Sequence, residues 1–280
     1  MKKILLFIAL LIASIPMPSE AADGTSLVPV FQREVDRRLN PPYEVQRLYA
    51  RLLEVALKNA KTPVTKSQYV LMVDRNPHVQ AVFLYWLDSQ ALSERWHFIG
   101  ASPASTGKPG EFEHFITPLG VFAHSLENKD FRAEGTRNDL GIRGFGIKGM
   151  RVYDFGWVQG ERGWGCGGEG QMRLLLHATD PDYLEQRLGE AMSKGCIRIP
   201  ATLNTFIDRY GLLDADYEQA LAEAETLWVL RADRIPTPWA GRYLVIVDSG
   251  ITKRPAWSYA PTAIARQRKP VKKSDSVNSQ

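Results

Sequence analysis

The segment Ser193-Lys194-Gly195-Cys196-Ile197-Arg198-Ile199 combines a thiol, a flexible glycine and two cations within a few residues. A cysteine attacks as its thiolate, and an ordinary cysteine has a pKa of about 8.5, so attack at neutral pH needs a base or a positive field. Lys194 and Arg198 each lie two residues from Cys196 and supply such a field. The segment therefore predicts a nucleophilic cysteine at position 196.

A base for this thiol is available in His177, which lies 19 residues upstream at the end of a predicted strand. The residues between them are predicted to form a helix, which can bring the chain back to the strand. A Cys with a His is the basic unit of thiol acyl transfer. Gly195 leaves room for a substrate carbonyl and frees the neighbouring N–H groups to face an oxyanion. We therefore expect Cys196 as nucleophile and His177 as base, with Ser193, Lys194, Gly195 and Arg198 positioning the oxyanion or a substrate carboxylate.

The chain on either side of this segment reads as short strands with few helices. Alternating or continuous apolar runs closed by turn residues predict the strands, and apolar stripes at helical spacing predict the helices. The pattern indicates an α+β, mainly β, domain over residues 65–250. The predicted strands are 69–73, 79–87, 96–100, 120–124, 172–177, 227–230 and 243–247, and the predicted helices are 181–192 and 201–210.

Two further segments differ from this strand-rich pattern. Residues 22–64 carry two apolar stripes separated by Pro41-Pro42, which predicts an N-terminal helical hairpin packed on the main domain. Residues 126–171 are rich in glycine and mixed charge, with little periodicity. Loops of this length inside a compact domain are usually functional. We interpret 126–171 as an insertion that forms a lid or binds substrate.

Both ends of the chain are predicted to lie outside the folded domain. Lys2 and Lys3, an apolar run of about a dozen residues and small residues at 19 and 21 predict a cleaved signal peptide over 1–21 and a periplasmic protein. A spanning helix needs about 20 apolar residues, so no integral membrane segment is expected after signal removal. Residues 251–280 are basic and predicted to be disordered. An exported chain is not expected to bind nucleic acid.

Cys166 and Cys196 are the two cysteines of the chain, and in an exported protein they would by default form a disulfide. That reading describes a non-catalytic wall-binding protein. However, the strand ending at His177 spans about 20 Å between them, and a disulfide needs Cα atoms within about 7 Å. We therefore expect two free thiols. The cysteines also lack the paired spacing of a metal site, so neither metal nor organic cofactor is expected.

Taken together, His177, Ser193, Gly195, Cys196 and Arg198 resemble the signature of the L,D-transpeptidase catalytic domain, the YkuD family. That family carries a His, a gap of about 15 residues, then Ser/Thr-x-Gly-Cys and an Arg or Asn two places later. A second signature resembles its "STG…TPxGxF" motif, at 105–108 and 117–122. The resemblance covers roughly residues 68–200, and the segment 126–171 has little counterpart in it. It implies an L,D-transpeptidase-like β-sandwich.

The resemblance also implies a reaction and its partners. Cys196 would attack the peptide bond after a diaminopimelate residue in a donor stem peptide of peptidoglycan and form a thioester, with His177 moving the proton. An amine of an acceptor stem would then take the acyl group. A carbapenem is expected to acylate the same thiol. Hydrolysis on the same scaffold, by a carboxypeptidase or an enzyme that cuts wall links, needs the same thioester and is the alternative function.

Overall fold

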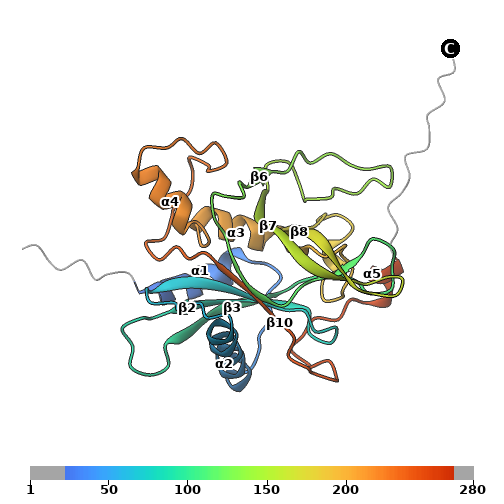
Figure 1. Cartoon of the computed structure of the whole chain (residues 1–280), viewed down its shortest axis with the longest axis horizontal. Helices are drawn as coiled ribbons and strands as arrows, with labels where there is room; N and C mark the ends of the chain where they lie inside the picture. Colours follow the sequence, from blue (N-terminus) through green and yellow to red (C-terminus); the bar gives the residue numbers. More distant parts are fainter. Residues whose placement is uncertain (1–22, 268–280) are drawn as a thin grey trace, which may run out of the picture.

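The computed structural model describes residues 23–267. The predicted signal peptide at 1–21 and the end of the basic tail beyond residue 267 lie outside these residues. The prediction that the tail 251–280 is disordered is wrong for its described part, because Trp257 packs edge-on to Tyr49 and Phe83, and Ser258 is buried. Among the described helices, none is long and apolar enough to cross a membrane. The fold is mixed α+β and mainly β, as the sequence predicts (Figure 1).

The first sheet has five strands in the order β3-β2-β1-β10-β5. The neighbours β1 and β2 are fully buried apart from Gln68, so their apolar runs reflect cover on both faces. β10 comes from the far end of the chain and pairs parallel with β1, whereas the other pairs are antiparallel. The strand bounds are β1 Gln68–Asp74, β2 Ala81–Leu87, β3 Trp96–Pro103, β5 Gly120–Ala123 and β10 Tyr243–Val247.

The second sheet carries the candidate site and has the order β4-β7-β8-β9, with β6 paired to β7 off this path. Its centre is a long antiparallel hairpin of β7 and β8, and β9 then pairs parallel with β8. The bounds are β4 Phe115–Ile116, β6 Phe131–Arg132, β7 Arg151–Arg162, β8 Glu169–Ala178 and β9 Ile197–Ile199.

One hydrophobic cluster contains inward residues of both sheets, such as Leu71 and Leu244 of the first and Leu174 and Ile197 of the second. Helices α1 (Leu27–Glu34) and α3 (Ala201–Tyr210) add to this cluster. The bounds of α3 confirm the predicted helix 201–210. The outer face of the first sheet is covered instead by α2 (Tyr43–Asn59), which forms a second cluster (Figure 1).

The predicted N-terminal helical hairpin is wrong, because α1 and α2 pack on opposite faces of the first sheet. Each helix has its own apolar stripe: Phe31 of α1 packs edge-on to Phe206 of α3, whereas α2 buries Tyr49, Leu53 and Leu57 at intervals of four residues. The stripes are correct, but a stripe does not specify which sheet face it covers.

Two other predicted elements are wrong. Residues 181–192 form turns and the short 3₁₀-helix η2 (Glu185–Arg187), because the chain leaves the helical conformation at Leu188 (ψ +153°) and Gly189, with φ +93°, donates its N–H to Ala104 O at 2.7 Å. A helix over these residues would need that N–H within itself. Residues 227–230 form a turn and no strand. Short helical elements not predicted separately are η1 (Gly24–Ser26), α4 (Ala215–Ala222) and α5 (Ala263–Gln267).

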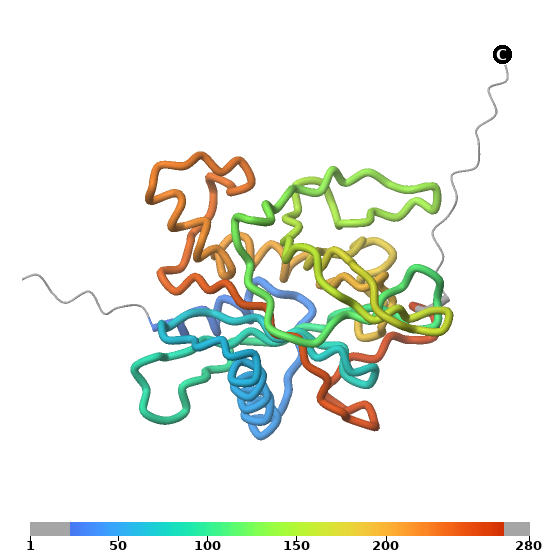
Figure 2. The backbone as a smooth tube through the Cα atoms, in the orientation of Figure 1, coloured from blue at the N-terminus to red at the C-terminus, as the bar shows by residue number. Residues whose placement is uncertain are grey.

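The segment 126–171 is more ordered than its composition suggests, since it contains β6, all of β7 and the start of β8. Only part of it, residues 133–150, forms a long excursion beside the β7–β8 hairpin (Figure 2). The interpretation of the whole segment as a loop is therefore wrong. The sequence does not predict a strand as long as β7, because Gly156 and Gly160 interrupt its pattern. Gly156 has φ +82° and lies at the irregularity in pairing between Asp154 and Trp157.

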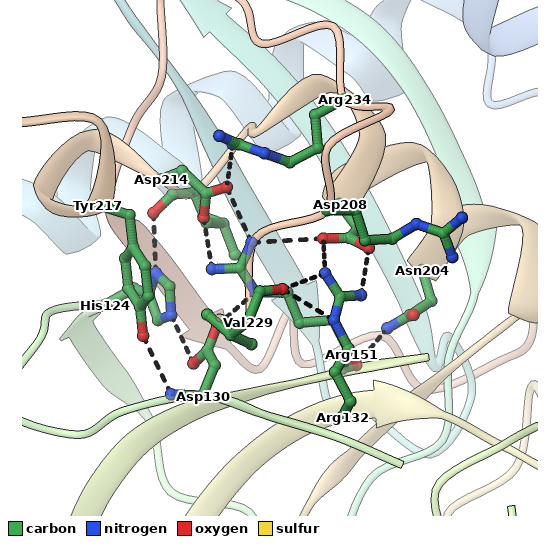
Figure 3. Close-up of polar contacts among 12 residues, drawn as sticks. His124, Asp130, Arg132, Arg151, Asn204, Asp208, Asp214, Tyr217, Val229 and Arg234 are labelled. Carbon is green, nitrogen blue, oxygen red and sulfur yellow. Dashed lines mark hydrogen bonds and ion pairs between the residues drawn. The ribbon is translucent and has the colours of Figure 1, made fainter. Parts of the chain in front are cut away.

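A buried cation joins this segment to the helices. Arg151 at the start of β7 is completely buried and donates to Asp130 at 2.6 Å and to Asp214 at 2.8 Å, and lies 3.4 Å from Asp208 (Figure 3). His124, also fully buried, lies 2.8 Å from Asp130. Burial of an ionised group is tolerated only when it is paired and hydrogen-bonded, and here three chain segments supply the carboxylates.

We predict that Arg151→Met lowers the free energy of unfolding by about 3–5 kcal/mol, because it leaves buried carboxylates uncompensated. Urea denaturation monitored by circular dichroism measures this. The matched control is Arg33→Met, which breaks an exposed pair with Glu34 and should cost less than about 1 kcal/mol. Equal small losses for both variants would show that the network contributes little to stability.

Candidate functional site

The segments 105–108 and 193–198, which are at least 85 residues apart in the sequence, meet at one place in the fold. Ser105 and Arg198 exchange two backbone hydrogen bonds of 2.9 Å. Thr106 O accepts from the N–H of Ser193 at 2.9 Å, and Lys108 N–H donates to Ser193 O at 3.0 Å. The segment 105–108 thus lies against the cysteine loop and β9 as an additional strand-like edge.

Thr117, in the second half of the upstream motif, locks this junction. Its buried hydroxyl accepts the N–H of Gly107 at 2.8 Å and donates to Gly195 O at 2.7 Å. A Cβ on Gly107 would lie 1.9 Å from Phe115 O, so only glycine fits at this crossing. The side chain of one threonine therefore connects the upstream motif to the loop of the nucleophile.

The cysteine loop is a tight turn closed by Ser193. The Ser193 hydroxyl donates to Cys196 O at 2.5 Å and accepts the Gly195 N–H at 3.0 Å. Gly195 has φ +124°, a conformation that favours glycine. The Gly195 N–H is therefore committed to Ser193, and the expectation that neighbouring N–H groups face an oxyanion stays a prediction. Ser193 itself is fully buried and shapes the turn.

His177 and Arg198 lie on one face of the second sheet. In the β8–β9 ladder His177 is opposite Arg198 and Leu176 is opposite Ile197. Because side chains alternate between faces, Leu176 and Ile197 enter the core while His177 and Arg198 lie on the other face. Cys196 lies directly before β9 and follows Gly195, whose φ is +124°, so the alternation of β9 does not extend to its side chain.

The two groups are neutral in this structure. Burial lowers the pKa of His177 to about 3, with a further contribution from the Arg198 charge. Burial raises the pKa of the Cys196 thiol above its usual value, although a backbone hydrogen bond from Leu175 and the Arg198 charge oppose the shift. The His177 Nδ1 lies 2.7 Å from Ala178 O, which defines Nδ1 as the donor and leaves Nε2 as the basic nitrogen. Both groups therefore favour their neutral forms near pH 7.

The other predicted positioning residues differ in their environments. Lys194 is exposed and pairs with Glu113 at 3.0 Å, so its charge is directed away from the thiol. Arg198 is partly buried and close enough to influence both His177 and Cys196 electrostatically. The thiol itself lies 3.7 Å from Arg173 O.

Several residues around the site were missed by sequence reasoning. Phe145, from the 133–150 excursion, packs edge-on to His177 with ring centroids 4.8 Å apart. Trp157 is largely exposed and lies over the Arg173 guanidinium at 5.6 Å, and Arg173 pairs with Asp154. These residues lie in or beside the segment without periodicity, where the sequence offered only the presence of the tryptophan.

Cys166 and Cys196 are both free thiols, and Cys166 is exposed in the turn between β7 and β8. Within residues 23–267 no group of three or more His, Cys, Asp or Glu side chains is arranged to hold a metal ion. The site is therefore described by a thiol, an imidazole and a neighbouring guanidinium.

No family model matches the chain, and no curated protein matches it. Among solved structures, the chain is similar to a fused Zn-dependent amidase/peptidase/peptidoglycan-binding domain-containing protein from Clostridium acetobutylicum. The match has 15% sequence identity and a TM-score of 0.29, and it covers 76% of this chain and 66% of that one, just under two thirds of its length. A similarity with this TM-score does not establish a shared fold or activity.

We predict that Thr117→Val lowers the free energy of unfolding by about 1–3 kcal/mol, because it leaves Gly107 N–H and Gly195 O without their partner. Denaturant titration measures the loss. Thr205→Val is the matched control, since its hydroxyl is on the exposed side of α3, and should change stability by less than about 0.5 kcal/mol. A loss no larger than that of the control would mean that the bridge does not hold the loop.

We also predict the pH dependence of thiol reactivity. In a Cys166→Ala protein, the rate of alkylation of Cys196 by iodoacetamide should rise with pH and not level off below about pH 8.5, because only the thiolate reacts. Since His177 is already neutral above about pH 3, no inflection is expected near pH 6–7. A plateau reached below pH 7 would instead reveal a preformed thiolate–imidazolium pair.

Proposed function

We propose that the protein is an exported, periplasmic cysteine acyltransferase that cross-links peptidoglycan stem peptides through a thioester on Cys196. The observation that carries the proposal is the convergence of the separate motifs at 105–108, at Thr117 and at 193–198 around the loop of one thiol, with His177 paired to Arg198 on the adjacent strand. This is the arrangement that the resemblance to L,D-transpeptidases requires.

The first half of the reaction follows from the protonation states. Nε2 of His177 takes the thiol proton as Cys196 Sγ attacks the scissile carbonyl carbon, so no stable ion pair is needed beforehand. The C–N bond then breaks, and the imidazolium gives its proton to the leaving amine. The products are the shortened donor peptide, held as a thioester on Cys196, and the free amine of the leaving residue. The Arg198 charge stabilises the anionic sulfur and disfavours a long-lived imidazolium.

The second half transfers the acyl group. His177, neutral again, accepts a proton from the acceptor amine as its nitrogen attacks the thioester carbonyl, and the thiol is restored. Since Gly195 N–H is bonded to Ser193, another donor must bind the oxyanion, and the N–H of Cys196 is the nearest along the chain. Preorganised N–H groups of this kind account for a large share of catalysis in acyl transfer.

Transfer rather than hydrolysis is supported by the excursion 133–150. Its Phe145 side chain covers the edge of His177, and an apolar cover over a reactive acyl group limits attack by water. The charges nearby give transfer no further support. Glu134 and Asp139 are exposed on this segment, but Arg137, Arg143 and Lys148 lie on it as well. Asp130, before β6, is buried against Arg151.

The test is incubation of the purified protein with a disaccharide-tetrapeptide, with products read by mass spectrometry. Cross-linked dimer should form and should increase with acceptor concentration. Cys196→Ala should abolish turnover and His177→Ala should reduce it by about 10²–10⁴-fold, while the exposed-thiol control Cys166→Ala retains it. Turnover by Cys196→Ala would rule out the proposal, and release of only shortened peptides at every acceptor concentration would identify a hydrolase.

A further inference from the structure

A small cavity lies behind the cysteine loop, on the side of β9 that faces the 105–108 segment and the turns after β8. Its volume is about 20 Å³, and its polar lining comes from Ser105, Thr179, Arg187 and Arg198, with leucine and methionine side chains around them. A cavity needs about 10–15 Å³ to hold one water molecule. The space is therefore sufficient for one water-sized occupant.

The two arginines that line this cavity carry no compensating charge. The Nε atoms of Arg187 and Arg198 are buried and have no hydrogen-bond partner, and within the described part of the chain neither guanidinium is ion-paired with a carboxylate. The remaining bond of Arg198 is a long one, from Nη1 to Met192 O at 3.4 Å. Burial and the charge of Arg187 both lower the pKa of Arg198, so the two cations destabilise each other.

The contrast with Arg151 shows what is missing. Arg151 is completely buried, whereas Arg187 and Arg198 are partly exposed, and Asp130, Asp208 and Asp214 surround Arg151. Buried charges in proteins are normally paired in this way, because an unpaired one is costly. Arg187 and Arg198 have the cavity between them but no carboxylate of the described chain. A bound negative charge would satisfy their Nε donors and remove their mutual repulsion.

We propose that this cavity binds one small monovalent anion, held between Arg187 and Arg198. The volume admits a halide ion or the end of a carboxylate group and excludes a phosphate ester. The anion comes either from solution or from the donor peptide as its terminal carboxylate, and this second source rests on the proposed function. Arg198 is the partner of His177 in the β8–β9 ladder, so the anion would lie next to the reacting groups.

An anion bound in the cavity should lower the reactivity of the Cys196 thiol. The Arg198 charge helps to stabilise the Cys196 thiolate, and an anion beside Arg198 offsets part of that charge. A free anion should therefore slow alkylation of Cys196 in a saturable manner. A shift of one unit in the pKa of the thiol corresponds to a tenfold change in thiolate fraction, so an effect of about threefold is within reach of the measurement.

The first experiment is diffraction from crystals of the protein soaked in sodium bromide, with anomalous scattering recorded. A bromide peak between Arg187 and Arg198 is the expected result. A cavity that holds only water would overturn the proposal, whatever the enzyme does. This measurement uses the unmodified chain and does not depend on folding of any variant.

The second experiment measures alkylation of Cys196 in the Cys166→Ala protein as formate replaces gluconate at constant ionic strength. The rate should fall by about threefold and saturate. Adding Arg187→Gln should abolish the saturable part, whereas Arg231→Gln, which breaks an exposed pair with Asp233, should preserve it. A formate effect that is absent, linear or unchanged by Arg187→Gln would overturn the proposal.

The two sources are separated with donor peptides that end in a carboxylate or in an amide. If the substrate supplies the anion, formate raises KM for the carboxylate donor, and Arg187→Gln removes the preference for that donor. If the anion comes from solution, formate does not raise KM for the carboxylate donor. The unmodified protein and Arg187→Gln should then show no preference between the two donors. Absence of turnover with either donor would remove the proposed function and leave the bromide and formate results standing.

Discussion

The buried charge of Arg151 is the constraint on which the rest of the second sheet depends. This guanidinium is completely buried, and its position is stable only while Asp130, Asp208 and Asp214 surround it (Figure 3). These carboxylates come from the segment before β6, from α3 and from the residue preceding α4. One charge thereby fixes where the start of β7 meets the helices, and it sets the position of the hairpin whose second strand ends in His177.

The candidate site is assembled by backbone geometry more than by contacts among its reactive groups. Parallel pairing of β8 with β9 places His177 and Arg198 on one face, with Cys196 directly before β9. The turn between them is held by the Ser193 and Thr117 hydroxyls, each of which bonds backbone groups. Rigid support of this kind suits an acyl-transfer site, in which misplacement by about 1 Å can cost two orders of magnitude in rate.

Arg151 and Arg198 differ in whether carboxylates neutralise their charge. Arg151 lies in a neutralised network, whereas Arg198 retains its charge beside a neutral imidazole and a neutral thiol. A compensated charge contributes to the architecture. An uncompensated charge near a thiol instead influences which protonation state the site adopts, and its cost to stability is consistent with a functional role.

The sequence by itself determined the mainly β character, the helix 201–210 and most of the strands, because these depend on local periodicity. Its distinctive motifs also nominated the candidate site residues, which stay predictions. It failed where the outcome depends on distant partners. The stripes of α1 and α2 do not encode which sheet face they cover, the turn at 181–192 depends on the bond from Gly189 N–H to Ala104 O, and β7 contains glycines that only its pairing with β8 makes compatible with a strand. The position of Thr117 against Gly195, the commitment of Gly195 N–H to Ser193 and the neutrality of His177 are likewise tertiary results, since hydrogen-bond partners and burial are set only when segments far apart in the chain come together.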